Sequence, residues 1–473
     1  MFINRDVELK ILNNLFSLKK ASLVVCKGRR RIGKSKLLEE FGKSAKQFIE
    51  IQGLAPRDNI TKNDQLSAFS MQLSKCTRLP YLTITSWSQA FSLLNSIISD
   101  QKTVILLDEI SWMSAGDKDF AGILKLAWDT ELKMHDKLIL VLCGSVSSWI
   151  DNNILNNTGF RGRVSVSLTL DELSLHSCNL FWSKANNKIS DMEKFKILAV
   201  TGGVPKYLEE INIKKTAEEN IKSLCFQKQG YLFNEYDEIF KDTFNQRSAT
   251  YEKIVEKLCL GAKTVNEIAS CIEWKSGGTI SSYLNDLKDS GFIEKSIMYA
   301  PGKKKPLRII KYRLKDNYLR FYLKYIKDKK EKIEKNLYQH VALENLPEWE
   351  IVLGFQFENL VLNNIQSVCL ILDIDLSIIK SAAPFYQKKT KQKAGCQIDL
   401  LIETNYSLYV CEIKFQKLIK ADIIKKVNEK ILKLQYPKYL SVRPVLIYAG
   451  ELEEKINKED YFTKIIDFGQ LLK

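Results

Sequence analysis

The chain has 473 residues, more than one hydrophobic core usually serves, so two to four domains are expected. Hydrophobic residues make up 45% and charged residues 27%, a balance typical of globular proteins. No apolar run reaches the ~18 residues that a membrane span needs, and the N-terminus lacks a basic and then apolar secretory signal.

The net charge is +16, and the sequence pI is about 9.1. This excess favours a polyanionic partner, with nucleic acid first and an anionic membrane surface second. The alternative is that the lysines are spread over solvated faces. Ten cysteines without a C-x-x-C pair and only three histidines predict reduced thiols in the cytoplasm, with no zinc site.

Residues 1–165 alternate short apolar runs with longer amphipathic segments. The segments 21–28, 103–110 and 137–145 each contain a continuous apolar run of strand length. Such strands are typical of a parallel sheet that helices cover on both faces. This part of the chain is therefore predicted to be an α/β domain with a nucleotide-binding layout.

The stretch "GRRRIGKS", residues 28–35, fits the pattern G-x-x-x-x-G-K-[ST] between a strand and a helix. Its glycines permit the backbone angles that turn consecutive N–H groups toward phosphates. Its lysine is expected to reach the β- and γ-phosphates, and its serine hydroxyl is expected to bind Mg²⁺. An ordinary glycine turn is the alternative. The predicted nucleotide-binding residues in this loop are Gly28, Arg31, Gly33, Lys34 and Ser35.

Asp108 and Glu109 lie at the end of the strand "VILLDEI". Asp108 is expected to hold Mg²⁺ through water, and Glu109 is expected to polarise the attacking water. By itself, such an acidic pair can also be a helix cap.

Ser145 ends the third apolar strand, where it could sense the γ-phosphate or form a simple turn. Arg161 and Arg163 are candidates for an arginine finger that neutralises charge on the transferred phosphoryl group, and Arg163 is the one predicted to be catalytic. Ordinary surface arginines are the alternative.

The remaining chain divides by pattern into four segments. Residues 166–245 read as a helical lid with a break at "TGGVP", and residues 246–315 read as helices followed by a two-stranded ribbon, which is winged-helix order. A charged helical connector over 316–345 leads to a final domain at 346–473, which opens with a helix and continues with strands.

Together these motifs resemble the archaeal-type P-loop ATPases of the STAND class. The opening F-x-x-R-x-x-E-L box is matched by Arg5 and Glu8, and the GGxP motif of the lid is matched by Gly202, Gly203 and Pro205. The resemblance implies ATP as the nucleotide, with Mg²⁺, and allows oligomerisation on ATP binding. Two departures are a serine in the phosphate loop where the family often has threonine, and "TGFRGR" where it usually has a PLYGR-like stretch.

The segment after the lid looks like the winged helix that follows it in many members of this class. Residues 279–288 would form the recognition-type helix, and "APGKKKPLR" would form the tip of the wing. Consecutive lysines at a hairpin tip can contact duplex phosphates without reading sequence. A protein–protein module is the alternative.

The last domain carries charged residues in a pattern typical of a cation site. Asp399 lies on one strand of a predicted hairpin, and Glu412 and Lys414 lie two residues apart on the next strand, so that they share a face. Glu358 lies on the helix that opens the domain. Carboxylate oxygens bind Mg²⁺, which activates water for phosphodiester cleavage, and the lysine can orient the nucleophile or offset charge. A Glu–Lys pair on a half-solvated strand is the alternative.

This arrangement resembles the PD-(D/E)xK restriction-endonuclease-like fold, in the form of the C-terminal domain that often follows these ATPases. Gln397 stands where that family often has Glu. The expected fold is a parallel-sheet P-loop NTPase with a helical lid, a winged helix and a C-terminal α/β nuclease-like domain. The expected function is a cytoplasmic ATPase whose nucleotide state controls a nuclease-like domain on DNA. The alternatives are a signalling or scaffold ATPase and a DNA-binding regulator with an inactive nuclease fold.

Overall fold

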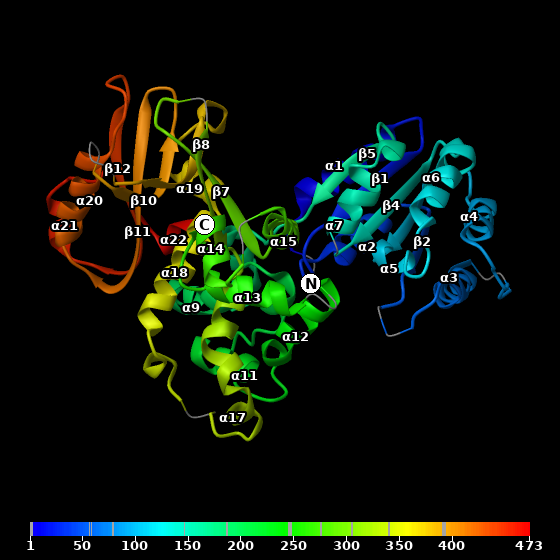
Figure 1. Cartoon of the computed structure of the whole chain (residues 1–473), viewed down its shortest axis with the longest axis horizontal. Helices are drawn as coiled ribbons and strands as arrows, with labels where there is room; N and C mark the ends of the chain where they lie inside the picture. Colours follow the sequence, from blue (N-terminus) through cyan, green and yellow to red (C-terminus); the bar gives the residue numbers. More distant parts are fainter. Residues whose placement is uncertain are drawn as a thin grey trace. The chain divides into compact units, whose positions relative to one another are not determined.

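The structure of the protein is a computed structural model, which describes residues 3–55, 57, 59–77, 80–145, 147–185, 188–244, 248–274, 277–303, 306–338, 341–389 and 394–473. The chain forms two compact units (Figure 1). Unit 1 comprises Met1–Asp171 with Asp289–Gly291, and unit 2 comprises Glu172–Lys288 with Phe292–Lys473. Among the described residues, no helix has the length and apolarity to traverse a bilayer.

The described part of unit 1 contains a five-stranded sheet in the order β2-β3-β4-β1-β5. Every pairing in this sheet is parallel, and the three predicted apolar runs form β1, β3 and β4. The predicted α/β fold with a parallel sheet is therefore confirmed. The strands are β1 (Ser22–Lys27), β2 (Gln47–Gln52), β3 (Thr103–Asp108), β4 (Leu138–Gly144) and β5 (Val164–Thr169).

Side chains of the central strands alternate between two hydrophobic layers, as the period of a strand requires. Leu23 and Val25 of β1 face a layer that includes side chains from α3, α4 and α6, whereas Val24 and Cys26 face a layer that includes side chains from α1 and α2. Because both faces are covered, these strands carry almost no polar side chain. The helices of unit 1 are α1 (Asp6–Asn14), α2 (Lys34–Gly42), α3 (Lys62–Thr77), α4 (Trp87–Ser96), α5 (Ile110–Met113), α6 (Phe120–Thr130) and α7 (Ser147–Ile150).

The boundary predicted at residues 165 and 166 falls inside β5, and the helices of unit 2 follow that strand. These helices share one core with the segment predicted as a connector. Tyr318, Tyr322 and Ile326 of that segment are buried, so it packs inside the unit. Between α16 and α17 the chain makes a π-helical turn, Tyr322–Ile326. The helices are α8 (Leu175–Asn179), α9 (Asp191–Thr201), α10 (Pro205–Glu209), α11 (Ala217–Cys225), α12 (Tyr231–Phe244), α16 (Asn317–Phe321) and α17 (Lys330–Glu334).

Helices α13 (Ser248–Leu258), α14 (Val265–Cys271) and α15 (Gly278–Asp289) precede an antiparallel hairpin of β7 (Ile293–Tyr299) and β8 (Pro306–Leu314). A short strand, β6 (Lys263–Thr264), pairs with β8 on its other side. Apolar spacing explains why α15 forms, since Ile280, Leu284 and Leu287 are buried at helical intervals. Its exposed face carries Thr279, Ser282 and Asn285.

The C-terminal part of unit 2 contains a second five-stranded sheet, in the order β13-β12-β11-β10-β9. The hairpin predicted around residues 404–406 is present as β10 and β11, whereas β11, β12 and β13 run parallel. Helix α18 packs on β11, and α20 packs on β10 and β11. The elements are α18 (Trp349–Leu362), α19 (Ile365–Ile371), β9 (Ser381–Gln387), β10 (Cys396–Glu403), β11 (Ser407–Ile419), α20 (Asp422–Lys433), β12 (Ser441–Leu452), α21 (Glu454–Lys458), β13 (Lys464–Asp467) and α22 (Phe468–Leu471).

Candidate functional site

The loop between β1 and α2 has the backbone that phosphate binding requires. Gly28 has φ +153°, and a Cβ at this position would lie 2.4 Å from the carbonyl oxygen of Leu170. Gly33, at the N-cap of α2, has φ +88°, and Arg31 also adopts a left-handed conformation with φ +68°. A side chain at either glycine would therefore clash or strain the backbone, so the loop needs both glycines for its shape.

Lys34 and Ser35 begin α2, and the side chain of Lys34 bonds back to the loop. The ammonium of Lys34 donates hydrogen bonds of 3.0 Å to the carbonyl oxygens of Gly28 and Arg29. Because both acceptors are neutral, its charge is available to a phosphate. The hydroxyl of Ser35 donates to the carboxylate of Asp108 at 2.8 Å, so two hard oxygen ligands lie side by side. This donor pair fits Mg²⁺.

Glu109 follows β3 in a strained conformation, with φ +48°, which is uncommon for a glutamate. Gly53 makes room for it, because a Cβ at Gly53 would lie 2.8 Å from the carbonyl oxygen of Glu109. The Glu109 carboxylate accepts hydrogen bonds from the amide (3.1 Å) and the hydroxyl (2.9 Å) of Ser145. Ser145, predicted to sense a phosphate, thus holds the carboxylate that is predicted to polarise water.

Arg163 is engaged in a bidentate ion pair with Asp129 of α6. Its Nε and one terminal nitrogen donate to the two carboxylate oxygens at 2.7 and 2.8 Å. Together with Lys125, this guanidinium lowers the pKa of Asp129 to about 2. Arg163 would have to leave Asp129 to reach a phosphate, so its role as an arginine finger stays a prediction. The other candidate, Arg161, is exposed.

Arg5, known from the sequence only as part of an opening box, supports the phosphate loop from behind. Its guanidinium is buried and donates to the carbonyl oxygens of Ile32 (3.2 Å) and Asp171 (2.7 Å). It also bonds to Glu8 at 3.2 Å. The two charged residues of the box thus bond to each other, and Arg5 ties the N-terminal helix to the loop.

An ion pair that no sequence pattern indicates lies at the end of β1. The ammonium of Lys27, directly before Gly28, lies 2.5 Å from the carboxylate of Asp151. Asp151 opens a π-helix, Asp151–Leu155, after β4. Asp151 is 124 residues away in sequence, so only the parallel pairing of β1 with β4 brings the two charges together.

In unit 2, the glycines of the "TGGVP" motif hold the start of that unit. Gly203 donates its amide to the carboxylate of Glu172 at 3.1 Å and accepts a hydrogen bond from the amide of Leu173 at 2.8 Å. A Cβ at Gly203 would lie 2.3 Å from the carbonyl oxygen of Leu173. Gly202 has φ +57°, and Pro205 begins α10. Within unit 2, the motif is explained by close backbone approach.

The predicted acids of the last domain act on one another electrostatically, together with a lysine that is not part of the predicted motif. The Asp399 carboxylate accepts a hydrogen bond from the amide of Ile413 at 2.9 Å, beside the irregular register of β10 with β9. The Glu412 carboxylate lies 2.5 Å from the ammonium of Lys430 on α20. These residues and Glu358 of α18 act on one another electrostatically, and we call them the acid cluster: Glu358, Asp399, Glu412 and Lys430.

Burial is the main cause of the raised pKa values of Asp399 and Glu358 in the acid cluster. Burial and the carboxylate of Glu412 raise the pKa of Asp399 to about 7. Burial also raises the pKa of Glu358. Burial disfavours the charge of Lys430, but Asp399 and Glu412 outweigh this effect and raise its pKa. A cation is therefore favoured at this position, and Lys430 supplies one.

Lys414, predicted to be the catalytic ammonium, is half-buried on β11, and its charge acts on Asp422 of α20. Its position two residues after Glu412 places it further along the same face of the strand. Among the described residues, no three acid, histidine or cysteine side chains are grouped closely enough to hold a metal ion. In this structure the three carboxylates therefore do not fit Mg²⁺ as a ready-made site, and Lys430 is the cation that meets them.

The β7–β8 hairpin, whose tip was predicted to contact DNA, packs against the C-terminal sheet. Its strand β7 runs beside β9, and the amide of Gly302 donates to both carboxylate oxygens of Glu403 at 3.1 Å. Leu307 packs against the hydrophobic cluster that contains Phe385. Of the three lysines at the tip, Lys303 is exposed, and positions 304 and 305 lie outside the described residues.

Comparison with known proteins identifies the first part of the chain. Residues 2–211 match the family described as an ATPase domain predominantly from Archaea. The chain is 27% identical over 361 residues to the uncharacterized protein MJECL04 of Methanocaldococcus jannaschii, which is 76% of each chain. It is also 44% identical over 41 residues to the uncharacterized ATP-binding protein MJ0423 of the same organism, covering 9% of this chain and 70% of that protein.

A solved structure agrees at the level of fold. The Walker-type ATPase Paby2304 of Pyrococcus abyssi superposes with a TM-score of 0.51 at 17% identity, covering 68% of this chain and 96% of that one. Residues 2–211, the segment that matches the ATPase family, contain the parallel sheet, the phosphate loop and the contact between Ser35 and Asp108. Residues 2–211 thus match an ATPase domain found predominantly in Archaea, and the protein is an ATPase.

Proposed function

We propose that ATP turnover in unit 1 controls how unit 2 handles nucleic acid. In the proposed reaction, Lys34 binds the β- and γ-phosphates, and Ser35 with Asp108 would hold Mg²⁺, which offsets phosphate charge when bound. Glu109 accepts a proton from the attacking water once its carboxylate leaves Ser145. The carboxylate of Glu109 is occupied by its hydrogen bonds to Ser145. We therefore propose that nucleotide binding releases Glu109 from Ser145 before the reaction.

The observation that carries the nucleic-acid part is the pairing, within unit 2, of a helix-and-hairpin module at 248–314 with a mixed sheet that holds the acid cluster. The module has the element order of a winged helix, and the exposed face of α15 carries hydrogen-bonding side chains. The net charge of +16 supplies attraction to a polyanion. The hairpin contacts the sheet through Gly302 and Glu403, so we propose α15 as the element that meets the nucleic acid.

Titration of the full chain with duplex DNA at two salt concentrations tests the partner class. Affinity is expected to fall steeply between about 50 and 200 mM salt, since each neutralised phosphate releases a counterion. Duplex binding that does not respond to salt, or no binding at either concentration, contradicts a nucleic-acid role for unit 2. An RNA duplex in parallel distinguishes the two polyanions.

Cleavage of nucleic acid is a second candidate, and the electrostatic coupling of Asp399 with Glu412 favours it, because two neighbouring carboxylates would stabilise a further cation. Against it stands the ion pair between Glu412 and Lys430, which occupies one carboxylate. If cleavage occurs, the C-terminal sheet is a nuclease-like fold in which Lys430 leaves Glu412 in only one nucleotide state.

Incubation of supercoiled plasmid with the purified chain, in Mg²⁺ or Mn²⁺ and with or without ATP, decides between cleavage and binding alone. If the acid cluster cleaves, Asp399→Asn abolishes nicking while ATP turnover stays at the wild-type level. The variant Asp422→Asn, on the exposed start of α20, is the matched control and keeps both activities. Intact plasmid under every condition excludes cleavage of this substrate and leaves regulated binding as the function of unit 2.

A further inference from the structure

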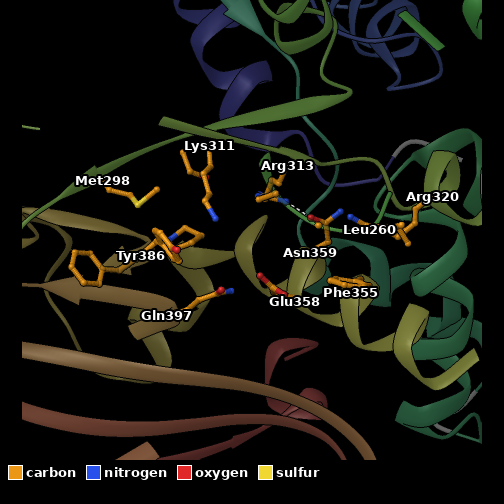
Figure 2. A pocket seen from close by; sticks show the side chains of 15 residues that line it. Leu260, Met298, Lys311, Arg313, Arg320, Phe355, Glu358, Asn359, Tyr386 and Gln397 are labelled. Atoms are coloured by element: carbon orange, nitrogen blue, oxygen red, sulfur yellow. Dashed lines mark hydrogen bonds between the residues drawn. The ribbon is translucent and has the colours of Figure 1, made fainter. Parts of the chain in front are cut away.

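A cavity of about 320 Å³ lies within unit 2, and the β7–β8 hairpin forms one of its walls (Figure 2). Alternate residues of a strand share a face, so Ser296 and Met298 of β7 and Lys311 and Arg313 of β8 all line the cavity. Ser296 and Lys311 are direct partners across the hairpin. This wall therefore presents an ammonium and a guanidinium together.

The facing wall comes from α18 and from strands β9 and β10. Figure 2 shows Lys311 reaching from the hairpin toward the space in which Glu358, Tyr386 and Gln397 lie. The ammonium of Lys311 lies 4.1 Å from the ring centroid of Tyr386. Glu358 is the acidic side chain among the described lining residues, and it also belongs to the acid cluster.

Two arginines beside this space are buried with neutral partners. Arg313 is 8% exposed and donates to the amide oxygens of Asn359 and Asn363. Arg320 is 4% exposed, and its described acceptors are the amide oxygen of Gln356 and backbone carbonyl oxygens. Neither arginine, nor Lys311, forms an ion pair with a carboxylate among the residues that the structure describes.

Buried cations are normally balanced by an acid, because removing a charge from water is unfavourable. Here burial lowers the pKa of Arg313 to about 10, and it lowers the pKa of Arg320 as well. The carboxylate of Glu294, the partner of Arg313 across the hairpin, acts on Arg313, and that of Glu358 acts on both arginines and on Lys430. Among the described residues that line the cavity, three cations still meet one carboxylate, and a bound anion would offset this surplus of positive charge.

The remaining walls are apolar and aromatic. Met298, Phe355 and Phe385 line the cavity with Tyr386, and the guanidinium of Arg320 lies 5.6 Å from the ring centroid of Phe355. A volume of about 320 Å³ lies at the lower end of the range of small-molecule sites. The ligand that fits is compact, with an anionic end and a flat or apolar end.

We propose that this cavity binds a phosphate monoester of the nucleotide class, as a site separate from the phosphate loop of unit 1. The phosphate accepts hydrogen bonds from Lys311 and Arg313, and the base lies against the aromatic wall that includes Phe355 and Tyr386. Glu358 opposes the ligand, because its carboxylate faces the same cations. This proposal does not require that the acid cluster cleaves nucleic acid, and the two proposals can be tested separately.

The test is calorimetric titration of the full chain with uridine 5′-monophosphate, in a Lys34→Ala background that removes phosphate binding in unit 1. A Kd below about 1 mM is expected. Lys311→Met should weaken binding about tenfold, since one charge-assisted hydrogen bond is lost. Glu358→Gln should tighten binding several-fold, because a like charge is removed. Lys295→Met, on the other face of the same hairpin, is the matched control and leaves Kd unchanged.

A purely structural role for these cations predicts a different result. If uridine without phosphate binds as tightly as the monophosphate, or if neither Lys311→Met nor Glu358→Gln changes Kd, the proposal is overturned. Absence of binding up to about 10 mM overturns it as well. Titration with a 5′-phosphorylated dinucleotide identifies the source of the phosphate. If the dinucleotide binds as tightly as the monophosphate, the natural ligand is the 5′ end of a nucleic-acid strand. If the dinucleotide does not bind, the natural ligand is a free nucleotide.

Discussion

Lys34→Ala is expected to reduce ATP turnover by about 100-fold or more, because the β- and γ-phosphates lose the cation that offsets their charge. In the structure, Lys34 is held over the loop by the carbonyl oxygens of Gly28 and Arg29. Alanine removes these hydrogen bonds but leaves the glycine backbone intact, so nucleotide affinity falls together with turnover. Release of phosphate from ATP by the purified variant is the measurement.

The matched control is Lys43→Ala at the other end of α2, where the lysine is exposed and paired with Glu40. Its turnover should equal that of the wild-type chain, because surface pairs of this kind contribute little. Unchanged turnover in Lys34→Ala, with the fold intact by circular dichroism, would show that the phosphates bind elsewhere.

Lys430→Met is expected to destabilise unit 2 by about 3 kcal/mol at pH 8, since it leaves the carboxylates of Glu412 and Asp399 without their cation. The loss depends on pH with a definite sign. The folded pKa of Asp399, about 7, lies above its unfolded value near 3.8, so stability falls as pH rises from 4 through 7. Without Lys430 this fall steepens, and the variant is closer to wild type at pH 5.5.

Urea unfolding at pH 5.5 and pH 8, with EDTA in the buffer, measures this effect. Lys414→Met is the matched control, because it removes the lysine that the sequence pattern selects from the same face of β11. The free energy of unfolding of Lys414→Met should differ from that of the wild-type chain by less than about 0.5 kcal/mol. If Lys414→Met lowers the free energy of unfolding more than Lys430→Met does, then Lys414, and not Lys430, is the lysine that balances the carboxylates of the acid cluster.

The nucleotide site could be predicted from the sequence because its residues lie in short, locally determined stretches. Gly28 and Gly33 permit a loop shape that depends on few neighbours. Asp108 ends an apolar run, and the burial of that run as β3 places Asp108 at the C-terminal end of an inner strand. The ATPase assignment and the parallel sheet are confirmed on this basis. The individual roles of Glu109 and Arg163 stay predictions, because each side chain is paired within the protein.

Long-range packing explains what the sequence could not show. Lys430 lies 18 residues after Glu412 on an amphipathic helix, where a lysine reads as part of a solvated face. Gly302 meets Glu403 across 101 residues, so the docked hairpin left no local pattern. The connector was predicted from its charges, but Tyr318 and Ile326 bury it in the core. The winged-helix and nuclease-like assignments stay predictions.

The measurement that most directly tests control of unit 2 by ATP is fluorescence anisotropy of a labelled DNA duplex with the full chain, with and without ATP and Mg²⁺. We predict that nucleotide changes the duplex affinity of the wild-type chain by about fivefold or more, which is the range of ordinary coupling between sites. The same comparison in Lys34→Ala should show no change. Equal duplex affinity with and without ATP in the wild-type chain would contradict the account.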